Sequence, residues 1–247
     1  MISQTGGFSL SVLAGAPAVI TTLSKIINPK AQVDATIAVI AYNEEGFIER
    51  MLATLITQDY FEYANNYEII LVDSGSTDKT VEIASKYVDR VIQAKKGKLS
   101  ARNQSIKEAK YDIVVNLDAD ILLFRNTLSH LLKPFEDDNV VATTGILFEG
   151  VRTWSWIITR LFAPRIIGTI SAVRKNAFVG FDESIDQLNR ELMILEEEIR
   201  FMRRMKARGK VVQTLACVLH PPRRAMCVIG SDIFKKYCEM IYHSDRF

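Results

Sequence analysis

The chain has 247 residues, of which 48% are hydrophobic and 24% are charged, and its formal net charge at pH 7 is +2. A chain of this length and composition corresponds to one ordinary globular domain with short additional segments. The hydrophobic content excludes a disordered protein. The nearly balanced charge argues against a dedicated nucleic-acid binder, so no nucleic-acid partner is expected.

The cysteines and histidines indicate neither a disulfide framework nor a zinc site. Cys217, Cys227 and Cys238 form no CxxC pair, and an odd number leaves one thiol outside any disulfide. The three histidines lie at none of the spacings typical of zinc sites. We therefore expect a reducing compartment and a cytoplasmic protein.

The ends of the chain differ from its middle. Residues 1–24 carry no charge, but they lack the basic start of a signal peptide, and Gly15 and Pro17 interrupt them too early for a spanning helix. We expect residues 1–34 to be an N-terminal arm, loosely packed or bound to a membrane surface. The folded domain is predicted over residues 35–225, and a helical extension over residues 226–247.

From Thr36 onward, short β-branched runs alternate with amphipathic stretches, which is the pattern of βαβ units. The predicted strands are residues 36–41, 68–72, 91–92, 113–117, 140–148, 168–173 and 211–219. The predicted helices are residues 44–56, 99–109 and 192–208, with a further helix after Asp78 that Ser76 or Thr77 caps. This order predicts an α/β fold with a mostly parallel central sheet.

Polar segments follow three of the predicted strands, at residues 42–44, 73–74 and 118–120. Ligands of open α/β sheets bind at the carboxyl ends of the strands, so these segments are expected to converge on one crevice. Asp118 and Asp120 leave an extended strand on the same side, about 7 Å apart at Cα. Oxygen donors without nearby histidine or cysteine favour Mg²⁺ or Mn²⁺. Taken alone, the Asp-x-Asp pattern is also typical of a solvated turn.

Six motifs occur in an order that is informative as a set. They are TIAVIAYNEE at 36–45, EIILVDSGSTDKT at 68–80, GKLSARN at 97–103, DIVVNLDAD at 112–120, RKNAFVGFDE at 174–183 and LEEEIRFMRRMKARGKVV at 195–212. Over about residues 35–220 the chain resembles family 2 glycosyltransferases. The resemblance implies a GT-A, Rossmann-like fold, a nucleotide-diphospho-sugar donor, a Mn²⁺ or Mg²⁺ ion, and inversion at the anomeric carbon by direct displacement.

The resemblance also implies roles for individual residues. The residues that would line the nucleoside pocket or approach the nucleotide are Ala41, Tyr42, Asn43, Glu44, Asp73, Ser74 and Ser76. Lys98 and Arg102 fall in the segment that holds the nucleotide in the family. The alternative interpretation is that both are solvated cations on the surface. One departure from the family is Ser105, where a glycine is common.

The resemblance also implies a metal site, which lies at residues 118–120. Asp118 lies near the ribose and the metal, Ala119 belongs to the donor-binding residues, and Asp120 is the more direct metal ligand, bridging to the diphosphate. His220 is a candidate third ligand, with an ordinary loop histidine as the alternative.

The catalytic base has two candidates, because the Glu-Asp pair of the family stands here as Glu196, Glu197 and Glu198. Counting back from Gly209 makes Glu198 the base. Helix geometry agrees, because Glu198 falls on the apolar face of Leu195, Ile199, Met202 and Met205, whereas Glu196 and Glu197 point elsewhere. A surface acidic run at a helix start is the alternative, and the choice between Glu197 and Glu198 stays open.

The motifs allow three functions: an active glycosyltransferase, a binding module without turnover, and a nucleotidyltransferase. We favour a glycosyltransferase. A UDP-sugar is the first choice for its donor, and a GDP-sugar is the second. Its acceptor is a glycan or a lipid-linked molecule. The aromatic and arginine-containing run of residues 152–165 either lies at a membrane surface, which would make the enzyme a peripheral membrane protein, or packs inside the domain.

Overall fold

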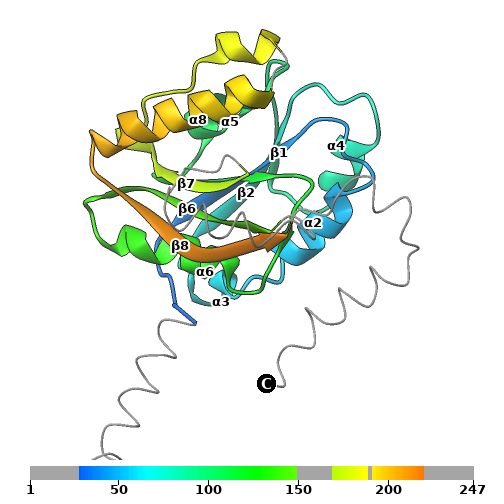
Figure 1. The fold of residues 1–247 in the computed structure, drawn as a ribbon. Helices are drawn as coiled ribbons and strands as arrows, with labels where there is room; N and C mark the ends of the chain where they lie inside the picture. Colours follow the sequence, from blue (N-terminus) through cyan, green and yellow to red (C-terminus); the bar gives the residue numbers. More distant parts are fainter. Residues whose placement is uncertain (1–27, 149–168, 189–190, 220–247) are drawn as a thin grey trace, which may run out of the picture.

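The computed structural model describes residues 28–148, 169–188 and 191–219. In these residues, eight strands form a single sheet with the order β3-β2-β1-β4-β7-β6-β8-β5. The strands are β1 (Ala35–Ala41), β2 (Tyr67–Asp73), β3 (Arg90–Gln93), β4 (Ile113–Asp118), β5 (Leu122–Leu123), β6 (Val140–Phe148), β7 (Ile170–Arg174) and β8 (Lys210–Leu219). Helices cover both faces of this sheet (Figure 1).

The sheet is parallel in its first half and mixed in its second. Strands β3, β2, β1 and β4 run parallel to one another. Strand β7 is antiparallel to both β4 and β6, β6 and β8 are parallel, and β5 is antiparallel to β8. The predicted α/β class is confirmed, and the predicted parallel arrangement describes the half that carries the βα repeats.

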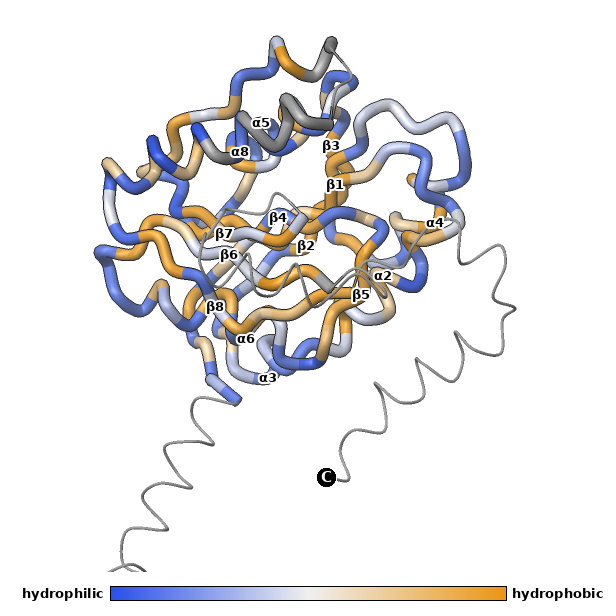
Figure 2. Tube along the Cα trace, in the orientation of Figure 1, coloured by the Kyte–Doolittle hydropathy of each residue, from blue (hydrophilic) through white to orange (hydrophobic). Residues whose placement is uncertain are grey.

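The central strands are buried on both faces, which explains their continuous apolar sequences. All seven residues of β1 and all six of β4 are buried. Because side chains alternate along a strand, Ile37 and Val39 join one hydrophobic core while Ala38 and Ile40 join the other. Figure 2 shows the hydrophobic segments gathered in the central strands.

Each core is closed by its own helices. The first contains side chains of α2 (Ile48–Leu55), α3 (Tyr60–Tyr63), α4 (Thr80–Ala84) and α6 (Thr127–Leu132). The second contains side chains of α5 (Lys98–Glu108) and α8 (Glu191–Lys206). Short 3-10 helices occupy Lys133–Glu136, Lys175–Ala177 and Glu183–Leu188. Helices α5 and α8 therefore lie on the same side of the sheet (Figure 1).

One predicted helix start and one predicted helix cap are wrong. Helix α2 begins at Ile48 and not at residue 44, because the preceding residues form a turn that bonds to the next loop. Helix α4 has Lys79 at its N-cap position without a side-chain cap bond, so neither Ser76 nor Thr77 caps it. The Ser76 hydroxyl donates instead to Asp73, at 2.5 Å.

The last stretch of the predicted N-terminal arm packs on the domain. Ala31 is fully buried in the first core. The Tyr60 hydroxyl donates to the carbonyl of Val33 at 2.7 Å, and Asp34 accepts two hydrogen bonds from Asn66. Residues 29–34 are therefore anchored to the domain, while residues 1–27 lie outside the described residues.

A buried carboxylate at the start of β2 predicts a pH dependence of stability. Glu68 accepts hydrogen bonds from Arg90 Nε at 2.8 Å, Thr36 Oγ1 at 3.1 Å and the Lys110 N–H at 3.2 Å. Burial by itself raises the pKa of Glu68, but these bonds and the charge of Arg90 outweigh it and lower the pKa. Glu68 therefore stabilises the fold above the ordinary glutamate pKa, and this contribution is lost as the pH falls through the lowered value.

When the pH is lowered from about 5 to about 3, the range around the ordinary glutamate pKa, the unfolding free energy of the Glu68→Gln variant is expected to decrease less than that of the wild type. Urea denaturation at a series of pH values measures this difference. Glu62→Gln is the control, because Glu62 forms an ion pair in which both side chains are more than half exposed. Equal pH profiles for the wild type and Glu68→Gln would contradict the prediction.

Candidate functional site

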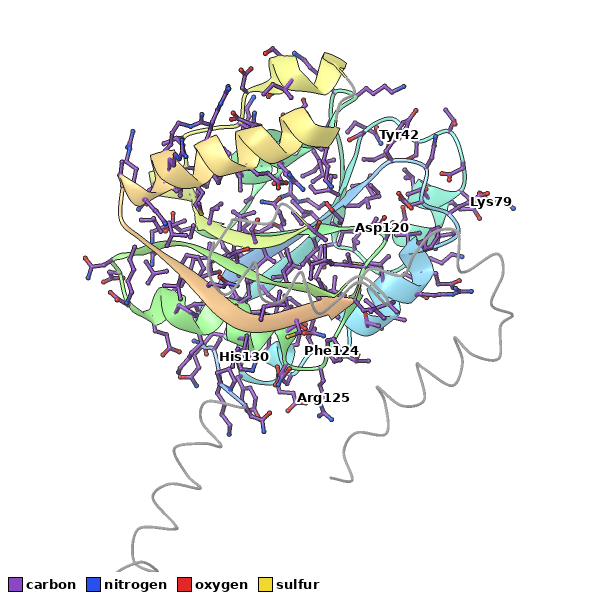
Figure 3. The ribbon with its side chains drawn as sticks, in the orientation of Figure 1. Tyr42, Lys79, Asp120, Phe124, Arg125 and His130 are labelled. Atoms are coloured by element: carbon purple, nitrogen blue, oxygen red, sulfur yellow. The ribbon has the colours of Figure 1, made fainter. Side chains whose placement is uncertain are left out.

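The three polar segments meet at the carboxyl edge of the parallel strands, as predicted. Ala41 of β1 lies opposite Asp73 of β2, and Ile40 lies opposite Asp118 of β4. Backbone bonds continue beyond the strands, from Ser74 N–H to the Ala41 carbonyl at 2.9 Å and from Ala119 N–H to the Ile40 carbonyl at 3.0 Å. Figure 3 shows Tyr42 and Asp120 at this end of the sheet.

The loops after β1 and β2 are locked together by side-chain to backbone hydrogen bonds. The Asn43 N–H donates to Ser76 Oγ at 2.9 Å, and Asn43 Oδ1 accepts from the Thr77 N–H at 2.8 Å. The Glu44 N–H donates to Thr80 Oγ1 at 2.7 Å. Asn43 has a φ of 54°, a left-handed conformation that asparagine tolerates better than most residues. These bonds fix the position of the two loops relative to each other.

Asp73 shapes the turn that follows its own strand. Its side chain accepts from the N–H groups of Gly75 and Ser76 and from the Ser76 hydroxyl, and the residue is 1% exposed. Gly75 has a φ of 90°, which only glycine adopts without strain. Ser74 Oγ donates to the carbonyl of Gly97 at 3.4 Å and so links this turn to the start of α5.

An aromatic ring and a cation lie beside the loops that follow β1 and β2. Tyr42 is 41% exposed, and the Lys96 ammonium lies 5.0 Å from the centroid of its ring. A partly exposed aromatic ring and a neighbouring cation together suit a planar, anionic ligand such as a nucleotide.

A chain of alternating charges crosses from α5 to α8. Asp118 accepts from Lys98 Nζ at 2.8 Å and contacts Arg102 Nη2 at 3.5 Å. Arg102 Nη1 donates to Glu198 Oε1 at 2.9 Å. Lys98 and Arg102 are four residues apart on one helix and therefore face the same way. The structure thus brings together four residues that the sequence analysis placed at the donor and base sites.

The two cations, Lys98 and Arg102, differ in how far their side chains are buried. The Arg102 side chain is 1% exposed, whereas that of Lys98 is 39% exposed. The alternative of a solvated surface cation is therefore wrong for Arg102. A buried guanidinium needs charged partners to offset its lost hydration, and Asp118 and Glu198 supply them.

Glu197 and Glu198 both lie on the buried side of α8, with exposures of 1% and 9%. The prediction that Glu197 points elsewhere is wrong, and so is the alternative of a surface acidic run for these two residues. Glu197 accepts from Arg204 Nη2 at 2.5 Å and from the Asp182 N–H at 3.0 Å. These bonds offset the cost of burying its charge. Phe201, absent from the predicted apolar face, is fully buried beside them.

The family model described as glycosyl transferase family 2 matches residues 36–211 of the chain. The chain belongs to glycosyl transferase family 2. This match covers the strands and helices that carry the alternating charges, so the resemblance to family 2 is confirmed at the level of the family.

Curated relatives of this family 2 chain match over part of their length. A poly-beta-1,6-N-acetyl-D-glucosamine synthase from Staphylococcus aureus is 34% identical over 119 residues, which cover 44% of this chain and 27% of that protein. An uncharacterized glycosyltransferase from Haemophilus influenzae is 30% identical over 111 residues, 42% of this chain and 43% of that protein. The matched region thus spans less than half of these relatives.

Solved structures confirm the GT-A fold of the family 2 chain. A mannosyltransferase from Pyrobaculum calidifontis, in complex with GDP-Man and Mn²⁺, aligns with a TM-score of 0.64 and 21% identity over 87% of this chain and 67% of that one. A glucosyl-3-phosphoglycerate synthase from Mycobacterium tuberculosis, in complex with Mn²⁺, UDP and phosphoglyceric acid, aligns with a TM-score of 0.58 and 19% identity, covering 89% and 77% of the two chains.

The donor atoms at the end of β4 fit a hard divalent cation. Asp118 and Asp120 are 8% and 9% exposed and offer oxygen ligands. Within the described ranges, no group of three or more histidine, cysteine, aspartate or glutamate residues gathers as a complete protein cage. Two carboxylates suit Mg²⁺ or Mn²⁺, which take further ligands from phosphate and water. His220 lies outside the described residues.

Other expectations also fall outside the described part of the family 2 chain. They concern residues 1–27, the aromatic run at 152–165 and the extension at 226–247. Of the helices that the structure does describe, none has the length and apolar character needed to cross a bilayer.

Sequence reasoning missed the residues that hold α8 in place. Arg204 Nη2 donates to the carbonyl of Gly180 at 2.9 Å, and the Asn103 side chain bonds the backbone of Phe181 and the carboxylate of Glu183. Asn103 stood inside a quoted motif without a role. The polar sequence of α5 carries no signal that this turn of the helix is partly buried.

Proposed function

We propose that the chain is an inverting glycosyltransferase, which moves a sugar from a nucleotide-diphospho-sugar to a hydroxyl or phosphate acceptor. The observation that carries the proposal is the pair of carboxylates on one buried arginine. Asp118, at the carboxyl edge of the sheet, and Glu198, on α8, both contact Arg102. A donor-side carboxylate and a base are thereby held across a single guanidinium.

The donor site is assigned to the edge formed by β1, β2 and β4. Ala41, Tyr42, Asn43, Glu44 and the turn of Asp73, Ser74 and Ser76 would surround the nucleoside, and the exposed Lys98 would meet the diphosphate. A UDP-sugar is the first choice and a GDP-sugar the second. The complexes of the Mycobacterium tuberculosis and Pyrobaculum calidifontis enzymes, with UDP and GDP-Man respectively, support both.

The proposed reaction is a direct displacement at the anomeric carbon. A hydroxyl oxygen of the acceptor attacks the anomeric carbon on the face opposite the leaving group, forming the new C–O bond as the bond to the diphosphate breaks. Glu198 takes the hydroxyl proton, and the nucleoside diphosphate leaves with the bonding electron pair. Asp118 and Asp120, with His220 as a third candidate ligand, would hold a Mn²⁺ or Mg²⁺ ion that neutralises charge building on the diphosphate.

The acceptor is proposed to be a glycan or a lipid-linked molecule. The Staphylococcus aureus relative is by name a synthase of a glycan polymer, which favours the glycan. The tryptophans and arginines of residues 152–165 favour a lipid-linked acceptor met by a cytoplasmic enzyme lying peripherally on the membrane.

A donor screen followed by product analysis tests the proposal. A ligand that binds only the folded state raises the melting temperature. We expect UDP-GlcNAc, UDP-glucose or GDP-Man to raise it in the presence of Mn²⁺, and the bound donor to be cleaved to a nucleoside diphosphate. Release of pyrophosphate would show a nucleotidyltransferase instead. Binding without any cleavage would show a binding module.

A further inference from the structure

Arg102 has the geometry of an internal brace between two helices and the sheet. Its Nη1 donates to Glu198 on α8, and its Nη2 contacts Asp118 on β4. Its Nε is buried without a hydrogen-bond partner among the described residues. The two Nη contacts therefore set the orientation of the guanidinium.

The surroundings of Arg102 fix it further. The Ser105 hydroxyl donates to Asn116 Oδ1 at 2.6 Å and also lies 2.7 Å from the Arg102 carbonyl, which ties this turn of α5 to β4. The guanidinium carbon lies 6.0 Å from the centroid of the Phe181 ring. Serine at position 105, where the family often has glycine, thus serves to hold the backbone of Arg102.

The next residue along α5 docks the segment that leads into α8. Asn103 Oδ1 accepts from the Phe181 N–H at 2.8 Å, and its Nδ2 donates to the Phe181 carbonyl at 3.0 Å. Nδ2 also donates to Glu183 at 2.8 Å. Adjacent residues of α5 therefore hold both the base carboxylate and the chain that precedes its helix.

Burial argues against direct contact between Arg102 and a nucleotide. Both of its Nη groups are engaged by carboxylates, and its side chain is 1% exposed. Lys98, one turn earlier, is 39% exposed and contacts the same Asp118. The role of a cation that meets the donor belongs to Lys98.

We propose that Arg102 is a positioning residue, which sets the Glu198 carboxylate at a fixed place relative to Asp118 and so aligns the base with the donor. The inference rests on the proposed glycosyltransferase function. A planar guanidinium can hold two carboxylates in fixed directions, whereas an ammonium group acts as a point charge. Because small misplacements of a catalytic group cost much of its effect, loss of the brace slows transfer without removing the base.

The conservative variant Arg102→Lys separates positioning from donor binding. We expect kcat for cleavage of UDP-GlcNAc with Mn²⁺, water being the acceptor, to fall by about 10- to 100-fold. The donor KM and the dissociation constant of UDP should each change by less than about threefold, because Lys98 and the loops remain. Arg174→Lys is the matched control, since Arg174 is a largely buried arginine, with 15% side-chain exposure, on the strand β7 and outside the charge chain.

A double-mutant cycle tests whether Arg102 acts through Glu198. In the Glu198→Gln background, Arg102→Lys should lower kcat by less than about twofold, because the group that it positions is already inactive. Melting temperatures and circular dichroism establish that each variant is folded. A full, additive loss in the double variant would overturn the inference, and so would a loss of UDP affinity at unchanged kcat. If the wild type cleaves neither UDP- nor GDP-sugars, the proposed function itself fails, and the inference falls with it.

Discussion

Replacing Asp120 by asparagine is expected to lower sugar transfer by at least about 10³-fold and to remove the metal-dependent part of nucleotide binding. Asparagine keeps the size of the side chain but loses the charge that attracts a divalent cation. Asp118 alone is a weak substitute, because both of its oxygens already contact cations, those of Lys98 and Arg102. Asp118 is therefore not expected to make good the loss of the Asp120 charge.

The measurement compares UDP binding with Mn²⁺ and with EDTA in the wild type and in Asp120→Asn. The wild type should bind UDP more tightly with Mn²⁺, and Asp120→Asn should bind it equally weakly in both conditions. Asp138→Asn is the matched control, because Asp138 is exposed and lies outside the site. Full activity of the wild type in EDTA, or of Asp120→Asn with Mn²⁺, would exclude this role for the carboxylate.

The sequence predicted the strands of the donor half because their burial is complete. A strand covered on both faces reads as a continuous apolar run, and residues 35–41 and 113–118 are such strands. Because these strands are parallel, the polar residues that follow them lie at the carboxyl edge of the sheet. This does not depend on how the rest of the chain folds. The meeting of Ala41 with Asp73, and of Ile40 with Asp118, follows from that rule.

Other features depend on contacts between distant segments and leave little trace in the sequence. Helix α5 buries Ser100, Arg102 and Ser105 along with its apolar residues, so its pattern resembles a solvated helix. Arg102 is buried because Glu198, far along the chain, and Asp118 neutralise it. The reversed direction of β7 and the short helices α3 and α6 likewise have no local periodic signal long enough to identify them.

The burial of Glu197 illustrates the same limit and sharpens the choice of the base. A carboxylate is expected on the exposed side of a helix unless a partner compensates it, and the partner, Arg204, lies two turns later on α8. The helix-face argument selected Glu198 on the premise that Glu197 is exposed. In the structure both carboxylates are buried, and they differ in their partners. Glu197 accepts from a structural arginine and a backbone N–H, whereas Glu198 accepts from the arginine that also contacts Asp118.

Glu198→Gln is therefore expected to lower transfer by at least about 10²-fold while donor binding persists, because glutamine keeps the shape but cannot accept the acceptor's proton. The matched variant Glu197→Gln should act on stability instead, with a loss of about 1–3 kcal/mol of unfolding free energy, because it weakens a buried charged hydrogen bond. Urea denaturation, UDP binding and initial rates of UDP-GlcNAc cleavage separate the two effects. If Glu197→Gln stops cleavage in a folded protein while Glu198→Gln is mild, Glu197 is the base, and the contact between Arg102 and Glu198 is structural.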